Sequence, residues 1–312
     1  MDSEHKKKIA AGIVLFNSDD SIRLLACINS VLSQVEKVYI FDNSTINTDV
    51  GLSDNIVYVT EHDNKGIAYA LNHIMQMAKD DGYEWVITMD QDSILPEGML
   101  IDFEKRIVDN EDIAIICPQV IDKRRVYMQI NEENTEEFID MCITSASCTS
   151  ISAWEKIGKF DEWLFIDLVD NEFCKRLIVS GYKILQLNKW VLDQEFGKIV
   201  PKSERVQRFW IAISKIFRNK NFAKFSYKKI VSPLRVYYTN RNIVYVNKKL
   251  KVYGPVAYEN YNCKGYIGFL VSFSLPSFLR AEEKGKVLQA ILKGIKDGRS
   301  KEVEPWMAKG KR

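Results

Sequence analysis

The sequence predicts an α/β protein with a mostly parallel central sheet and a basic, mainly helical C-terminal extension. Three observations support this fold class. Strand-like and helix-like patterns alternate over the first hundred residues, polar turns follow the strand-like runs, and the composition changes beyond Pro201. With 312 residues, of which 46% are hydrophobic and 28% charged, the chain has the ordinary balance of a globular protein.

Four nearly continuous apolar runs are typical of strands buried on both faces of a parallel sheet. They cover residues 9–16, 37–41, 56–60 and 85–89. Helical spacing of apolar residues continues to about Gln34 after the first run and covers residues 67–79 after the third. Capping residues at positions 17–19 predict where the first of these helices begins.

The middle of the chain continues the pattern less regularly. Residues 101–108 predict a helix, and residues 113–117 predict a strand that ends at Pro118. Residues 131–140 are polar and predict a surface loop or edge. Residues 143–151 are rich in small hydroxyl side chains, which suits either a segment that approaches a ligand closely or a plain edge strand.

Two carboxylates, Asp90 and Asp92, directly follow the fourth apolar run. They therefore lie at the carboxyl end of a strand, where open α/β sheets bind their ligands. Hard oxygen ligands on a loop beyond a rigid strand suit Mg²⁺ or Mn²⁺ that carries a phosphorylated substrate. Asp-x-Asp alone is equally consistent with an acidic turn, so its neighbours decide the interpretation.

Other polar residues follow the neighbouring strands, namely Asn17, Asp42 and Asn43. A carboxylate after the second strand is placed to accept hydrogen bonds from a base or ribose. The sequence lacks both the dinucleotide-binding glycine fingerprint and a Walker-type loop. A metal ion held by the Asp pair is then the natural substitute for a glycine nest around phosphates. The alternative for Asn17 and Asn43 is helix capping or turn formation.

A second acidic block contains Asp167, Asp170 and Glu172, in or at the start of a predicted helix. Acidic residues are favoured at a helix N-terminus, so a capped first turn explains one or two of them. The aromatic and aliphatic run over residues 163–166 leads directly into the block. Because a carboxylate near apolar walls tends to have a raised pKa, the block is a candidate source of a general base.

From Lys202 to Lys251 the chain has fourteen basic residues and one acid, Glu204, interleaved with aromatic residues. An apolar segment follows at residues 266–279. This order favours contact with an anionic membrane surface over nucleic acid, since no nucleic-acid motif is present. A solvated helical extension is the alternative.

The expected compartment is the cytoplasm, with the inner face of the cell membrane as the place of any membrane contact. The six cysteines are scattered, which suits a reducing compartment, and neither a signal peptide nor a spanning segment is expected.

Taken in order, several motifs between residues 9 and 245 resemble the family 2, GT-A fold glycosyltransferases, and within them the bacterial rhamnosyltransferase-like branch. The matching stretches are Gly12-Ile13-Val14-Leu15-Phe16-Asn17, Phe41-Asp42-Asn43-Ser44, Asn64-Lys65-Gly66-Ile67-Ala68-Tyr69-Ala70-Leu71-Asn72, Met89-Asp90-Gln91-Asp92-Ser93, Phe165-Ile166-Asp167 with Asp170 and Glu172, and Arg235-Val236-Tyr237-Tyr238 with Arg241-Asn242. Asp90-Gln91-Asp92-Ser93 is similar to the form found in transferases of deoxysugars from dTDP donors.

The resemblance implies a catalytic domain at residues 1–200, with a nucleotide-sugar half at about 9–100 and an acceptor half at about 101–200, and a C-terminal region at 201–312. It implies inverting transfer, with rhamnose from dTDP-rhamnose as the best candidate, to a hydroxyl of a cell-surface polysaccharide or lipid-linked oligosaccharide. Homo-oligomerisation is also compatible with it.

The same resemblance assigns roles to residues. Asp170 would be the base, with Glu172 as the second candidate, and Asp167 would orient the acceptor. Asp42 would read the pyrimidine, and Asp90 and Asp92 would hold the diphosphate through Mg²⁺ or Mn²⁺. The complete donor set implied is Asn17, Asp42, Asn43, Asn64, Lys65, Asp90 and Gln91.

One departure from the family pattern concerns Gln194, which stands where many relatives carry a histidine that contacts the metal or diphosphate. Three alternatives stay open. The first is a related transferase that uses another donor, such as a UDP-hexose. The second is a non-catalytic, membrane-associated partner in a polysaccharide assembly complex. The third, a metal-dependent phosphohydrolase, lacks the His/Asp cluster of a two-metal site.

Overall fold

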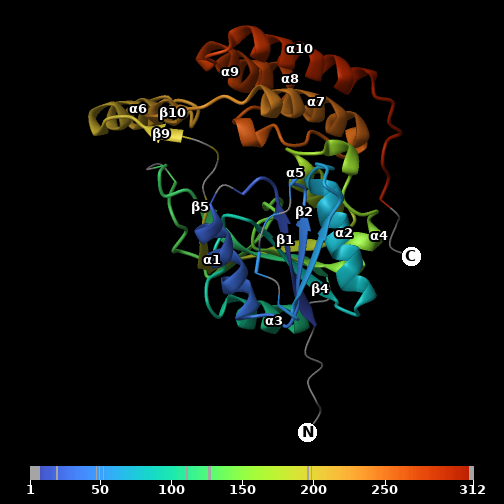
Figure 1. Ribbon diagram of the computed structural model, residues 1–312. Coiled ribbons are helices and arrows are strands. Elements are labelled where there is room, and N and C mark those ends of the chain that lie inside the picture. The colour runs from blue at the N-terminus through green and yellow to red at the C-terminus, as the bar shows by residue number, and fades with distance from the viewer. Residues whose placement is uncertain are drawn as a thin grey trace.

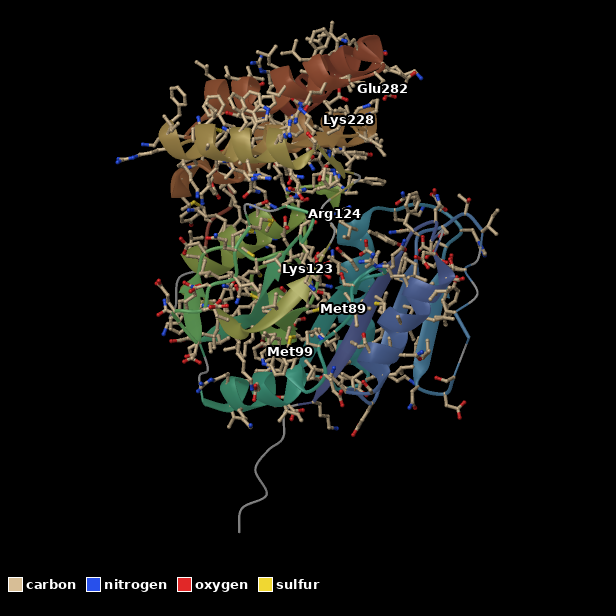
Figure 2. The ribbon with its side chains drawn as sticks, turned by 90° about the vertical axis from the view of Figure 1, so that its left-hand side faces the viewer. Met89, Met99, Lys123, Arg124, Lys228 and Glu282 are labelled. Carbon is tan, nitrogen blue, oxygen red and sulfur yellow. The ribbon has the colours of Figure 1, made fainter. Side chains whose placement is uncertain are left out.

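The computed structural model describes residues 8–18, 20–46, 48, 50–51, 53–109, 112–125, 128–194, 197 and 199–308. An eight-stranded sheet forms the centre, helices cover its faces, and a second layer of helices lies over one end of the sheet (Figure 1). Figure 2, turned by 90°, shows Met89 in the sheet and, above it, Lys228 of a short strand and Glu282 of the upper helical layer.

The main sheet has the order β3-β2-β1-β4-β7-β5-β8-β6. Its strands are β1 (Ile9–Leu15), β2 (Val38–Asp42), β3 (Ile56–Thr60), β4 (Trp85–Asp90), β5 (Ile113–Ile121), β6 (Glu136–Ile139), β7 (Ser147–Ser150) and β8 (Lys183–Asp193). The β1–β4 and β5–β8 pairs are parallel, as are β1–β2 and β2–β3, whereas β7 and β6 run antiparallel to their neighbours. The predicted mostly parallel α/β architecture is confirmed.

Helices on both faces explain why the strands are apolar throughout. Val38 and Ile40 of β2 face a core shared with α1 (Ser21–Leu32) and α3 (Met99–Asp109). Tyr39 and Phe41 face the other core, shared with α2 (Ile67–Asp80), α4 (Ile151–Lys156) and α5 (Val169–Val179). Successive side chains of a strand point to opposite faces, so burial on both sides needs a continuous apolar run.

Three local expectations need correction. Helix α1 is capped by Asp20, whose carboxylate accepts from the Arg23 amide at 2.9 Å, and not from within residues 17–19, of which Asp19 lies outside the described residues. Strand β5 continues past Pro118, because the register with β8 shifts between Pro118 and Gln119 and the ladder needs no donor there. Strand β7 is central and buried, not an edge strand. The polar segment before it does contain an edge strand, β6.

The C-terminal region is mainly helical, as expected. It contains α6 (Glu204–Ile216), α7 (Pro233–Lys249), α8 (Tyr266–Phe269), α9 (Leu275–Arg280) and α10 (Lys284–Ser300). A short hairpin of β9 (Ile199–Pro201) and β10 (Tyr227–Lys229) projects to one side together with α6 (Figure 1). Within the described part of the chain, no helix has both the length and the hydropathy to cross a membrane.

Helices α7 and α10 pack closely along their length. Gly294 of α10 faces the α7 backbone so tightly that a Cβ atom there would approach the Arg241 nitrogen to 3.2 Å, and Gly298 repeats the contact one turn later. Small residues at such positions allow two helices to approach closely. Helix α10 therefore packs tightly along α7.

Candidate active site

Parallel pairing brings the carboxyl ends of three strands together. Leu15 of β1 pairs with Asp42 of β2, and Val14 pairs with Asp90 of β4. The loops that follow are bonded to one another. The Gln91 side chain accepts from the Phe16 amide at 2.8 Å and donates to the Phe16 carbonyl at 3.3 Å. Gln91 therefore joins the loop after β4 to the loop after β1.

Asn17 and Asp42 belong to the same edge. The Asn17 amide donates to the Ser44 hydroxyl at 2.7 Å, and Asn17 itself has a φ of +43°. Asp42 is fully buried and accepts from the Tyr58 hydroxyl at 2.6 Å and from the Ser44 and Thr48 amides at 2.8 and 3.1 Å. Burial opposes ionisation, but these donors outweigh it and hold the pKa of Asp42 below its ordinary value. Asp42 is thus an anion fixed within its loop.

Asn43 and Asn64 shape the loop before α2. The Asn43 side chain accepts from the Lys65 amide at 3.1 Å and donates to the Gly66 carbonyl at 3.2 Å, while Asn64 accepts from the Gly66 amide at 3.0 Å. The Lys65 ammonium is exposed and pairs with Asp63 at 2.8 Å. These bonds assign loop-shaping roles to the two asparagines.

Gly66 connects this loop to the second acidic block. Its φ is +90°, and a Cβ atom at that position would lie 2.8 Å from the Phe165 Cα. The amide of the next residue, Ile67, donates to the Phe165 carbonyl at 2.6 Å. Only glycine combines this backbone conformation with such a close approach.

Asp92 stands close enough to Asp90 for its charge to affect the ionisation of Asp90. Burial, followed by the charge of Asp92, raises the pKa of Asp90 to about 6. The Gln194 amide nitrogen donates to an Asp90 carboxylate oxygen, and the Arg235 charge acts in the same direction, favouring the ionised form. Two neighbouring carboxylates in a partly buried position create a site that favours a cation.

Gln194 provides the test of whether a metal ion fits these residues. Its side chain is only 7% exposed, and its amide oxygen is buried without a hydrogen-bond partner among the described residues. With the Asp90 and Asp92 carboxylates, that oxygen would give three hard oxygen ligands, which suits Mg²⁺ or Mn²⁺. In the described ranges, no three His, Cys, Asp or Glu side chains gather as a metal site on their own. The residues fit a divalent ion once the Gln194 oxygen is included.

The second acidic block begins after a loop of unusual conformation. Phe165, Asp167 and Leu168 have φ values of +59°, +65° and +62°, and α5 begins at the next residue. Asp170 lies in the first turn of α5 and accepts from the Asn171 amide at 2.9 Å. Burial is the largest cause, and with smaller contributions from Cys142 and the Asp167 carboxylate it raises the pKa of Asp170 to about 7. Such a carboxylate is poised to take a proton near neutral pH.

Arg235, at the start of α7, links the two acidic sites. Its guanidinium binds both oxygens of Asp167, with the Nε–Oδ2 distance at 2.9 Å, and the Thr239 hydroxyl donates to Asp167 at 3.2 Å. The Arg235 charge lowers the pKa of Asp90, while Asp167 and Asp170 raise the pKa of Arg235. One cation from the C-terminal region is therefore within electrostatic reach of Asp90 and Asp170 together.

Glu172 lies elsewhere, and its placement corrects its nomination as a second candidate base. The side chain is fully buried and accepts from Arg176 at 2.6 and 2.7 Å and from Lys249 at 2.7 Å. A carboxylate held by two cations inside the core cannot meet an acceptor hydroxyl. Its function is to join α5 to α7.

No local sequence pattern indicates the roles of Arg235, Arg241 and Asn242, although all three lie within a family motif. Their partners are backbone and side-chain groups at residues 163–167, about 75 positions earlier in the chain. The motif itself was the only available signal.

Comparisons with known proteins concern the family and the fold. Residues 11–162 match the model described as Glycosyl transferase family 2. The curated dTDP-rhamnosyl transferase RfbF of Shigella flexneri is 26% identical over 198 residues, which are 55% of this chain and 64% of that protein. The alignment thus spans slightly less than two thirds of that relative.

Two solved structures are similar in fold. The structure of GalNAc-T7 with UDP, GalNAc and Mn²⁺ gives a TM-score of 0.52 at 12% identity, covering 87% of this chain and 57% of that one. TarS residues 1–349 of S. aureus give 0.47 at 13% identity, covering 94% and 89%. The former likeness, together with the mostly parallel sheet, establishes the GT-A fold.

Proposed function

Because the chain belongs to glycosyl transferase family 2 through residues 11–162, we propose that it is a metal-dependent, inverting glycosyltransferase. The observation that carries the proposal is the position of Arg235, whose guanidinium binds Asp167 in the second acidic block and whose charge also acts on Asp90 at the end of β4. It supports a single site with a cation-binding part and a proton acceptor. A displacement with inversion needs those two functions on opposite faces of the donor sugar.

On the donor side, Asp90, Asp92 and the Gln194 amide oxygen would hold Mg²⁺ or Mn²⁺. When bound, the ion supplies charge stabilisation to the departing nucleoside diphosphate. Gln91 keeps the β1 and β4 loops together beneath the nucleotide, and Asn17, Asp42, Asn43 and Asn64 maintain the surrounding loops. Lys65, whose exposed ammonium pairs with Asp63, would approach the donor from the α2 side.

On the acceptor side, Asp170 accepts the proton of the attacking hydroxyl. The pKa of about 7 leaves a useful fraction ionised at neutral pH and makes the group basic enough to take the proton. Asp167, held by Arg235 and Thr239, orients the acceptor from the entrance of α5. General-base help of this kind contributes on the order of 10²–10⁴ in rate.

The proposed donor is dTDP-rhamnose, with a UDP-hexose as the alternative donor. The Shigella relative is a dTDP-rhamnosyl transferase by its description, and this chain shares 26% identity with it. The proposed acceptor is a hydroxyl of a cell-surface polysaccharide precursor, either free or linked to a lipid.

We also propose peripheral contact of the C-terminal region with the inner face of the membrane. Four exposed aliphatic side chains follow one another at four-residue spacing along α8, the turn after it and α9, namely Ile267, Val271, Leu275 and Leu279. Residues 201–312 carry 25 Lys and Arg against seven Asp and Glu. Apolar side chains within a basic region suit an anionic lipid surface. Binding to phosphatidylglycerol vesicles, lost in Val271→Asp, is the expected result.

The central experiment measures nucleoside diphosphate release from dTDP-rhamnose, UDP-glucose and GDP-mannose, with Mn²⁺ and a panel of octyl glycosides as acceptors. We expect acceptor-dependent release from dTDP-rhamnose and its loss with EDTA. Turnover of UDP-glucose alone would favour the alternative donor. Absence of Mn²⁺-dependent binding of dTDP, UDP and GDP by calorimetry would instead favour a non-catalytic partner protein.

A further inference from the structure

The loop from Leu164 to Leu168 is held in a conformation that L-residues rarely adopt. Phe165, Asp167 and Leu168 all have φ between +59° and +65°. Non-glycine residues remain in this region only where the surrounding structure fixes them, and they concentrate at functional sites. The loop delivers the chain into α5, where Asp170 occupies the first turn.

Asn242 of α7 binds this loop from the C-terminal region. The side chain is fully buried, and its amide nitrogen donates to the carbonyl oxygens of Leu164, Ile166 and Asp167, each at 2.8 Å. A carboxamide has only two N–H groups, so three converging carbonyls use its donor capacity completely. The curvature that brings those three carbonyls together is the curvature imposed by the positive φ values.

Arg241 and Ile67 also donate hydrogen bonds to the loop and the residue before it. Arg241 donates to the Trp163 carbonyl and, at 3.1 Å, to the Leu164 carbonyl, and its guanidinium lies 3.9 Å from the centroid of the Trp163 ring. From the other side, the Ile67 amide donates to the Phe165 carbonyl. Each backbone carbonyl from Trp163 to Asp167 is therefore bonded, and Asn242 alone accounts for three of them.

We propose that Asn242 is a positioning residue of the transfer reaction, which holds residues 164–168 and thereby fixes the start of α5 and the place of Asp170 in its first turn. The inference rests on the proposed function, because the place of Asp170 matters only if Asp170 takes a proton. Asn242 acts through the loop and not by contact with substrate.

The variants that test this are Asn242→Ala and Asn242→Asp in the full-length protein. The matched control is Asn247→Ala, since Asn247 lies on the same helix and donates to the Ile243 and Val256 carbonyls at 2.8 and 3.1 Å, away from the loop. The assay is dTDP release from dTDP-rhamnose with Mn²⁺ and the best octyl glycoside, with dTDP affinity measured separately by calorimetry.

We expect kcat to fall at least about 100-fold in both Asn242 variants, within the range of general-base contributions, while dTDP affinity changes less than about threefold. Asn247→Ala should keep its kcat within about threefold. The isosteric Asn242→Asp keeps the shape and loses the donors, so wild-type kcat in that variant would overturn the inference.

The pH profile provides a readout that a merely structural role would not move. The groups that face Asp170 are Asp167 on its own loop, the Cys142 and Cys174 thiols, Arg235 of α7 and Tyr261 beyond α7. Release of the loop exposes Asp170 to water, so the acid limb of kcat should shift to lower pH by about one unit in Asn242→Ala. An unshifted limb contradicts the assignment.

If Asn242→Ala does not fold, as judged by circular dichroism, Asn242→Ser replaces it. Its single hydroxyl can donate to one carbonyl, so an intermediate kcat is expected, and a wild-type value refutes the inference.

The proposed function and the role of Asn242 are refuted by different results. A wild-type protein that releases no nucleotide from any donor refutes the proposed function. Wild-type activity retained in folded Asn242 variants refutes this inference alone.

Discussion

Replacement of Asp170 by asparagine should remove activity and increase stability, with the gain depending on pH. Burial raises the pKa of Asp170 from 3.8 to about 7, a shift of roughly three units at about 1.4 kcal/mol each. Because the raised pKa favours the protonated form, the folded state loses up to about 4 kcal/mol as pH rises from 3.8 through 7. A neutral asparagine at this position does not titrate, so the Asp170→Asn variant keeps its folding free energy over this pH range.

The free energy of unfolding should therefore be measured by urea denaturation at pH 5 and pH 8. We expect the advantage of Asp170→Asn over the wild type to widen by about 2–3 kcal/mol between the two pH values, while transfer falls by 10²–10⁴. Asp54→Asn, at an exposed turn, is the control and should show the same small difference at both pH values. An advantage that does not change with pH, or retained turnover, would refute the reasoning.

Four further predictions concern the metal site, the loop contact and the core. Asp92→Ala should nearly abolish transfer and Mn²⁺-dependent dTDP binding, and calorimetry that finds normal affinity would exclude its metal role. Gln194→Ala should weaken Mg²⁺ and Mn²⁺ binding in the presence of dTDP by about tenfold or more, as for other supporting ligands, whereas unchanged affinity would leave only the two carboxylates as ligands. Gly66→Ala should lower the melting temperature more than Gly82→Ala, because both have positive φ but only Gly66 faces Phe165; equal losses would contradict the close contact. Glu172→Gln should destabilise the fold by about 3–5 kcal/mol, since it removes the buried negative charge that faces both Arg176 and Lys249 and leaves Lys249 with Asp161 as its remaining carboxylate partner, and a loss under 1 kcal/mol would contradict the buried ion pair.

Local sequence patterns predict the place of a site residue where its immediate neighbours in the chain determine that place. Asp90 follows an apolar strand, so its place at the carboxyl edge of the sheet could be predicted from residues 85–92 alone. Asp170 precedes an apolar helix face, so its place in the first turn could be predicted similarly. The parallel pairing of β1, β2 and β4 then brings the loops after these strands together.

The sequence around Glu172 already contains the signals that separate this residue from Asp170. Two residues along a helix correspond to a rotation of about 200°, so Glu172 and Asp170 must point to opposite sides. Arg176 stands four residues after Glu172, which is the spacing of a helical ion pair. Helical geometry therefore already separated the two carboxylates.

Contacts between distant segments could not be predicted. The central position of β7 depends on pairing with β4 and β5, which its hydroxyl-rich sequence does not encode. The bonds from Asn242 to residues 164–167 connect groups about 75 positions apart. No periodicity indicates which loop a buried amide will bind.

The link from Glu172 to Lys249 has a practical consequence for engineering. Exchange of donor preference between relatives is best attempted by transplanting residues 9–100 alone, because the α5–α7 connection then remains intact. A hybrid joined at position 200 would combine Glu172 from one parent with Lys249 from another, and would inherit a mismatched charge in its interior wherever the parents differ. Segments 160–180 and 233–250 should be inherited together, as one unit of recombination.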